Sequence, residues 1–203
     1  MRVSKGETYE RVFINDEVNL CIEQEANSHV KIHVINASFS ITVNQLGEGC
    51  NTEIYGLENL HGNEDVTAET HITHSVGGGS SNQLIKFVLD DNARGHFIGD
   101  LKIVQDAQQT EAHQTNRNLL LSETAEMRTQ PQLEIYADDV KATHGASTGQ
   151  LDESALFYMQ QRGISKQKAR QLLIGAFMKD VLNSISDERV REELLNAIDG
   201  VVE

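Results

Sequence analysis

Along most of the chain, hydrophobic and polar residues alternate with a period of two. Apolar positions alternate with His and Lys in residues 29–34 (HVKIHV), and with Ser, Thr and Asn in residues 38–44 (SFSITVN). Residues 69–76 and 84–91 continue strand-like runs, and Gly, Asn and Asp residues separate the runs. A period of two is typical of strands that bury one face. Residues 1–150 are therefore predicted to form a strand-rich domain.

Two architectures fit this succession of strands and turns. One is a sandwich or barrel of antiparallel strands, and the other is a solenoid of stacked parallel strands. The scarcity of two-residue hairpin signals of the Asn-Gly type slightly favours the solenoid. Leu101, Leu119 and Leu133 recur at intervals of 18 and 14 residues, which we interpret as roughly one coil each. No strict repeat is present, so the residues alone leave both architectures open.

After Gly149 the hydrophobic period changes to that of helices. Asp152 and Ser165 are suited to cap the amino termini of helices, and Gly163 to end the first of them. Residues 151–203 are therefore predicted to form a helical segment of three short helices. Its apolar faces can pack on each other, on the end of the strand region, or on a partner.

The second and third helices each carry one apolar stripe at spacings of three and four residues. The stripe of the second helix comprises Ala169, Leu172, Leu173, Ala176, Phe177, Val181 and Ile185. The stripe of the third comprises Val190, Leu194, Ala197 and Ile198. We expect these side chains to be the buried faces of the two helices.

Composition narrows the classes of partner. The net charge is −14, from 31 acidic and 17 basic residues. A nucleic-acid role that depends on phosphate neutralisation is therefore not expected, nor is binding to an acidic membrane surface. No apolar run approaches the ~20 residues of a membrane span. The charged amino terminus lacks the apolar core of a secretion signal, so we expect a cytoplasmic protein.

Few motifs suggest chemistry, and we assign no catalytic residue. Cys21 and Cys50 lie 29 positions apart without a CxxC motif, so two reduced, partly buried thiols are expected. The glycines at 77–79 lack the GK[ST] ending of a phosphate-binding loop and indicate a turn. The carboxylate pairs at 90–91 and 138–139 stand at strand ends, where turn roles are usual.

Eight histidines are spread along the chain, at positions 29, 33, 61, 71, 74, 96, 113 and 144. On a strand, His29 and His33 share a face but lie about 13 Å apart, and His71 and His74 lie on opposite faces. Neither pair can chelate a metal ion by itself, although stacked coils can bring histidines together. We expect surface or structural roles for all of them except His144.

His144 differs from the others in its placement. Val140, Ala142 and His144 share one face of a strand, so the imidazole lies on the side that carries apolar residues. Such a histidine is either hydrogen-bonded within the core or presented to a partner or a metal ion. Parity by itself leaves both roles open.

The chain around His144 resembles a known family. It is similar to the carboxy-terminal core of SufD-type members of the SufB/SufD family of iron–sulfur cluster assembly scaffolds. The similarity rests on NRNLLLS (116–122), PQLEIYADDVKATHGA (131–146) and LFYMQQRGIS (156–165), in that order and spacing, within residues 113–185. It implies a mainly β fold, a right-handed parallel β-helix followed by a short helical carboxy-terminal segment.

The resemblance also implies a function. Members of the SUF system act as non-catalytic scaffold subunits in a complex of SufB, SufD and the SufC ATPase. SufB and SufD pair through their β-helices, and the motif histidine, here His144, is the implied cofactor-binding and metal-binding residue of a transient iron–sulfur cluster. SufC docks on the helical segment, where Phe157, Tyr158, Arg162 and Phe177 are the candidate partner-binding residues. No stably bound cluster is expected in the isolated chain.

Three departures from the family pattern refine this expectation. Ala125 stands where SufB-type members carry a key cysteine, which favours the SufD type. Ala142 stands where many SufD proteins carry a cysteine, so one potential sulfur ligand is missing. The usual member is about twice as long, with an amino-terminal domain before the β-helix.

Two other classes of function are kept as alternatives. One is a self-associating structural module, because the end and edges of an isolated β-helix promote pairing, and a homodimer is then expected. The other is a metal-dependent or polysaccharide-active β-solenoid enzyme that uses histidines from stacked coils.

Overall fold

A computed structural model of the chain describes the backbone of residues 1–200 and the side chains of residues 1–196. In this part of the chain, twelve strands precede three helices. The strands are β1 (Arg2–Val3), β2 (Thr8–Ile14), β3 (Val18–Gln24), β4 (His29–Ile35), β5 (Phe39–Gln45), β6 (Asn51–Leu60), β7 (Asp65–His74), β8 (Ser80–Leu89), β9 (Arg94–Ile103), β10 (Thr110–Leu120), β11 (Glu126–Ile135) and β12 (Val140–Gly149). The helices are α1 (Glu153–Gln161), α2 (Lys166–Asn183) and α3 (Glu188–Gly200).

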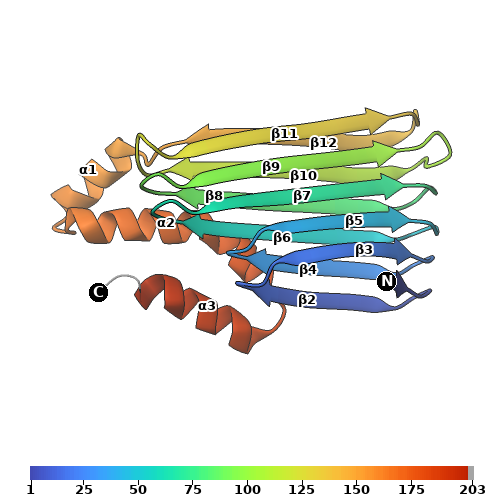
Figure 1. Cartoon of the computed structure of the whole chain (residues 1–203), viewed down its shortest axis with the longest axis horizontal. Coiled ribbons are helices and arrows are strands. Elements are labelled where there is room, and N and C mark those ends of the chain that lie inside the picture. Colours follow the sequence, from blue (N-terminus) through green and yellow to red (C-terminus); the bar gives the residue numbers. More distant parts are fainter. Residues whose placement is uncertain (201–203) are drawn as a thin grey trace.

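The strands form two parallel sheets of six strands each. Sheet A has the order β1-β3-β5-β7-β9-β11, and sheet B has the order β12-β10-β8-β6-β4-β2. Consecutive strands therefore alternate between the sheets, and each return to a sheet adds a strand beside the previous one. The result is the stack of coils seen in Figure 1. The prediction of a parallel β-solenoid is confirmed, and the antiparallel alternative is wrong.

One coil is longer than the leucine spacing suggested. Leu101 and Leu133 are register partners in neighbouring strands of sheet A, so one full coil separates these two positions. Leu119 lies between them in the sequence but belongs to sheet B, where it packs against the helical segment. An interval of 14 to 18 residues is about half a coil, because every coil contains one strand of each sheet. Our interpretation of one coil per interval was wrong.

Most turns between the sheets share one backbone feature. Nine of the eleven turns each contain one residue with φ between 53° and 73°. Most of these residues are Gly or Asn, the residue types that adopt positive φ with the least strain. The positions are Gly6, Asn15, Asn27, Asn36, Gly49, Gly62, Gly78, Asp91 and Gln109. The Gly- and Asn-rich breaks seen in the sequence are therefore the corners of the solenoid.

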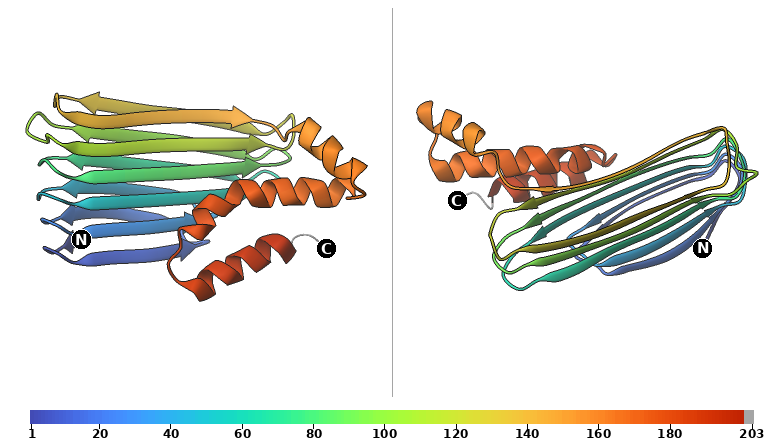
Figure 2. Two further views of the ribbon diagram at one scale, coloured as in Figure 1. Left: turned by 180° about the vertical axis from the view of Figure 1, so that it is seen from behind. Right: turned by 90° about the horizontal axis from the view of Figure 1, so that it is seen from above.

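Apolar side chains form two separate cores. The first fills the solenoid between the sheets and includes the fully buried Ile32, Ile72 and Phe97. The second lies on the outer face of sheet B, where Val88 packs with residues of α2 such as Val181. Figure 2 shows α2 lying across this side of the solenoid.

The caps of the helices agree with the sequence prediction. Asp152 accepts hydrogen bonds from the backbone N–H groups of Ser154 and Ala155 at the start of α1. Ser165 accepts one from the backbone N–H of Lys168 at the start of α2. Among the helices of the described residues, none is long and apolar enough to cross a membrane.

The buried face of α2 differs from the predicted stripe. Leu172 is 42% exposed, whereas Met178 and Leu182, outside the stripe, are 1% exposed. The carboxy-terminal half of the helix carries most of the contact with sheet B, so the residues of that half set its buried face. In α3, Val190 and Leu194 pack against the second core as expected. The side chains of Ala197 and Ile198 lie outside the described residues.

Candidate functional site

The solenoid ends in a coil whose strands are paired on one side only. Strand β11 pairs with β9, and β12 pairs with β10; within the described chain each is the last strand of its sheet. Inward-facing residues of this coil lack the covering that earlier coils receive. Leu133 and Ala142 are only partly buried, and Ile135 is 41% exposed. This end of the molecule therefore offers two ten-residue backbone edges and an open core.

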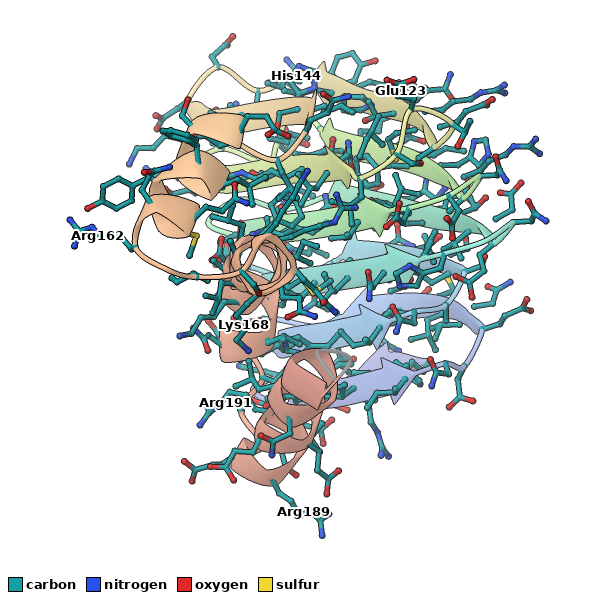
Figure 3. The ribbon with its side chains drawn as sticks, turned by 90° about the vertical axis from the view of Figure 1, so that its left-hand side faces the viewer. Glu123, His144, Arg162, Lys168, Arg189 and Arg191 are labelled. Atoms are coloured by element: carbon teal, nitrogen blue, oxygen red, sulfur yellow. The ribbon has the colours of Figure 1, made fainter. Side chains whose placement is uncertain are left out.

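His144 lies near the middle of β12 and faces the inside of the solenoid. Ala142, two residues earlier, is the register partner of the fully buried Ala112 and packs against the inner core. His144 has the same parity, as the sequence predicted, but it is exposed because no further coil covers it. Figure 3 shows it at the end of the stack. Within the described residues, His144 is therefore an exposed side chain and not a buried core histidine.

A column of polar side chains continues from His144 into the solenoid. Gln114 of β10 is the register partner of His144, and Gln83 of β8 is the register partner of Gln114. The two glutamines are 1% and 0% exposed. Within the described residues, the oxygen and the nitrogen of both side-chain amides lack a hydrogen-bond partner. This column was not predicted from the sequence, although glutamine at inward-facing positions of predicted strands is a recognisable signal.

Two other histidines are buried in structural positions. His33 stacks on Tyr55, with ring centroids 4.8 Å apart, and its Nε2 lies 2.8 Å from Ser184 Oγ. His74 lies inside the solenoid, with Nε2 2.9 Å from Ser81 Oγ. Burial lowers the pKa of each imidazole to about 4, and the Lys31 charge contributes at His33. Both rings are therefore neutral near pH 7.

One group of titratable side chains lies on the outer face of sheet A. His71 Nδ1 is 2.8 Å from Asp100 Oδ2, and His71 Nε2 is 2.9 Å from Glu69 Oε1. Both ring nitrogens are occupied, so neither is free to bind a metal ion or a substrate. Throughout the described residues, no three His, Cys, Asp or Glu side chains are arranged to hold a metal ion.

The cysteines and the paired carboxylates take other positions. Both cysteines are free thiols, as expected. Their burial differs from the prediction of two partly buried thiols, because Cys21 is exposed and Cys50 is buried. Asp91 accepts a hydrogen bond from the Gly62 backbone N–H, which is a turn role. Asp90 instead pairs with Arg170 of α2 at 3.1 Å and so helps to hold the helix.

The helical segment presents an exposed aromatic and basic group on α1. Phe157 and Tyr158 are 63% and 59% exposed. Arg162 donates a hydrogen bond to the Tyr158 hydroxyl at 2.6 Å, and its guanidinium lies 4.9 Å from the centre of that ring. Arg162 points away from the solenoid in Figure 3. Tyr158 and Arg162 therefore form one exposed pair, and Phe157 is a separate exposed side chain of α1.

Phe177 lies elsewhere, at the contact between α2 and sheet B. The Lys86 ammonium is 4.8 Å from the centre of the Phe177 ring and donates to the Phe177 carbonyl oxygen at 2.6 Å. It also pairs with Asp180 at 2.7 Å, while the Lys86 side chain is 2% exposed. Phe177 is thus part of an internal anchor. The role of Lys86 was not predicted from the sequence, although a charged residue inside the apolar run LIKFVL is a recognisable signal.

The family model and three relatives that match this chain all belong to one family. The family model described as "SUF system FeS cluster assembly, SufBD core domain" matches residues 16–177. The iron-sulfur cluster assembly protein SufD of Escherichia coli (strain K12) is 39% identical over 152 residues, which are 75% of this chain and 36% of the relative. SufD of Bacillus subtilis (strain 168) is 35% identical over 162 residues, 79% of this chain and 37% of the relative.

A third relative has a similar degree of identity. An iron-sulfur cluster assembly SufBD family protein of Synechocystis is 39% identical over 148 residues, 72% of this chain and 32% of the relative. The chain therefore spans about a third of the length of these three curated relatives.

Proposed function

Because this chain belongs to the SufB/SufD family of the SUF system for iron–sulfur cluster assembly, we propose that it is a non-catalytic, SufD-type scaffold subunit. In this proposal a SufB-type partner pairs with the open last coil, and a SufC-type ATPase docks on the helical segment. His144 offers one imidazole nitrogen to the iron of a transient cluster at the paired interface. The observation that carries the proposal is the exposed, inward-facing His144 on an edge strand.

The donor set of the chain limits what it contributes to the cluster. Imidazole is a suitable ligand for iron, but clusters are held mainly by thiolates. Ala142 provides no sulfur beside His144, and the Cys50 thiol is buried 3.1 Å from the Gly47 carbonyl oxygen in a distant turn. The exposed Cys21 lies on β3, near the opposite end of the stack of coils. The partner therefore supplies the thiolates, and a single ligand from this chain suits a cluster that must be released.

A His144→Ala variant tests the ligand role. The variant and the wild-type chain are co-expressed with SufB-type and SufC-type proteins, and cluster formation is followed by visible absorption of the purified complex. We expect the complex to form and the cluster signal to fall by tenfold or more. His61→Ala is the control, because His61 is an exposed histidine in a turn between sheets. Wild-type cluster formation by His144→Ala would show that the ligand role is wrong.

The aromatic group on α1 supports the second contact. Exposed Phe, Tyr and Arg side chains are the types that dominate binding energy at protein interfaces. We expect Tyr158→Ala to reduce capture of the SufC-type protein by about 30-fold, the effect of a hot-spot residue. Glu153→Ala, at an exposed position of the same helix, is the control. Phe177→Ala is a poorer test, because it also breaks the contact with Lys86.

The open edges also favour the alternative of a self-associating module. Parallel edge strands pair readily with another copy when no partner covers them. Light scattering of the pure chain measures this directly. A homodimer that dissociates when the SufB-type protein is added supports both proposals, whereas a strictly monomeric chain contradicts the self-associating module.

A further inference from the structure

The polar column below His144 contains buried groups without partners. Gln114 and His144 are register partners on adjacent parallel strands, so their backbones lie about 4.8 Å apart. Gln114 is 1% exposed, and neither atom of its amide has a partner within the described chain. A buried amide without a hydrogen bond costs about 1–3 kcal/mol, so such a group in a native fold calls for an explanation.

The Gln114 amide lies against Gly99 of the facing sheet and has no partner among the other polar side chains of its own strand. A Cβ atom at Gly99, in the facing sheet, would lie 2.5 Å from Gln114 Nε2, so glycine at that position keeps this space open. Asn116, two residues further along β10, already donates to the Ile85 carbonyl oxygen and accepts from Asn118. Gln114 is therefore the inward-facing polar group of β10 that is both next to His144 and uncommitted.

The neighbours of His144 on its own strand offer no alternative. Ala142 and Ala146, which share its face, carry no polar side-chain atoms. A metal-binding histidine usually donates its other ring N–H to an oxygen, which fixes the tautomer and the orientation of the ring. The side-chain oxygen of Gln114 is an acceptor at the adjacent position of the register.

We infer that Gln114 is a positioning residue for His144. The two side chains are not hydrogen-bonded in this structure. In the proposed arrangement a change of the Gln114 rotamer lets its side-chain oxygen accept a hydrogen bond from one imidazole N–H, which leaves the other ring nitrogen unprotonated and directed toward the open end. The functional meaning of this hydrogen bond rests on the proposed ligand role of His144. Its presence can be measured in the isolated chain, without cluster formation.

The chain offers a matched pair of variants. Gln83 belongs to the same column, is equally buried and equally without partners, but lies one strand further from His144. Gln114→Met and Gln83→Met each replace a buried amide by an apolar side chain of similar shape. We expect Gln83→Met to be at least as stable toward urea as the wild-type chain, because it removes an unpaired buried polar group. Gln114→Met also removes the proposed acceptor of His144, and because His144 is exposed we expect this variant to stay folded.

The experiment measures the tautomer of His144 in the full chain. Ring nitrogen chemical shifts measured by NMR report the tautomer, and the His144→Ala variant identifies which signal belongs to His144. We expect a single predominant tautomer in the wild type and in Gln83→Met, and a mixture in Gln114→Met. Gln114→Glu keeps the acceptor oxygen and should restore the wild-type tautomer. An unchanged His144 signal in Gln114→Met, or an equal change in Gln83→Met, would overturn the inference.

Cluster formation gives the second readout, in the complex with the SufB-type and SufC-type proteins. Loss of the group that orients a metal-binding histidine typically lowers affinity 10- to 100-fold. We expect a loss of about tenfold in Gln114→Met and none in Gln83→Met. If His144→Ala assembles clusters normally, the ligand role fails while the tautomer experiment still decides the hydrogen bond.

Discussion

At Glu58 a carboxyl group lies inside the solenoid with no exposed surface. Its one hydrogen bond comes from the Ala37 backbone N–H, at 2.8 Å. Burial raises the pKa of this carboxyl well above its usual value. The folded state therefore keeps a proton that the unfolded state releases, and stability falls as the pH rises above the usual carboxyl pKa. Glu58 thus limits the stability of the fold at neutral pH.

Glu58→Gln should remove this dependence. We expect the variant and the wild type to have similar urea midpoints near pH 4.5, and the variant to be more stable at pH 7.5. The wild type loses up to about 1.4 kcal/mol per pH unit from this group across the affected range. The exposed Glu123→Gln is the control. Parallel pH profiles of Glu58→Gln and wild type would contradict the prediction.

His33 affects the pH dependence of folding stability in the opposite direction from Glu58. Its pKa is about 4 in the folded chain, below the value of 6.5 for an unperturbed imidazole. Between these values the unfolded state binds more protons, so stability is lost as the pH falls from about 6.5 to about 4. We expect His33→Gln to reduce this loss by up to about 1.4 kcal/mol per pH unit, measured by urea unfolding. His61→Gln, at an exposed site, should leave the slope unchanged.

At the scale of elements, α2 is held on sheet B by more than its apolar face. Lys86 reaches from β8 to the Phe177 carbonyl oxygen and to Asp180, and Arg170 reaches from α2 to Asp90. Hydrogen bonds to charged groups contribute about 1.5–3 kcal/mol each when they are buried. These contacts hold the helical segment in place beside the strands.

Asp180→Ala should weaken this attachment without unfolding the solenoid. It leaves the Lys86 ammonium buried with only the Phe177 carbonyl, so we expect about 1–3 kcal/mol less protection of α2 in hydrogen exchange. The strands of sheet A should keep wild-type protection. Glu192→Ala, at an exposed position of α3, provides the control. Equal protection of α2 in both variants would show that the Lys86–Asp180 ion pair does not hold α2 on sheet B.

At the scale of the whole molecule, the faces of the solenoid differ in what covers them. The helical segment covers much of the outer face of sheet B, and the last coil leaves both sheets with open edges. Pro131, the only proline, lies on the edge strand β11, where a missing backbone donor is tolerated. The proposed pairing through the last coil and the proposed docking on the helical segment therefore involve separate surfaces and can be tested separately.

Ala146→Lys tests the pairing surface. It places a charge on the inward-facing side of the edge strand β12, a device that blocks edge pairing. Because Ala146 is exposed, we expect a change of stability below about 0.5 kcal/mol and loss of the SufB-type partner in co-purification. Ser147→Lys, the next residue and on the opposite face, should retain the partner. Retention by both variants would argue against pairing through this end.

The sequence by itself determined the local features. Alternation identified strand segments and the inward face of His144, and the capping residues Asp152 and Ser165 began their helices. These features depend on a few neighbouring residues, so one chain carries enough information. The segments that resemble the SufB/SufD family supplied the choice of solenoid, which the period of two had left open.

Only the tertiary structure decided which strands are neighbours. A period of two is the same for every pairing, so it gave neither the length of a coil nor the register that aligns Gln83, Gln114 and His144. It also gave no sign that Phe177 is held against Lys86, because that contact joins residues 91 positions apart. The exposure of His144 also depends on which strands are neighbours. Its side chain would be buried only by a further coil, which the described chain does not provide.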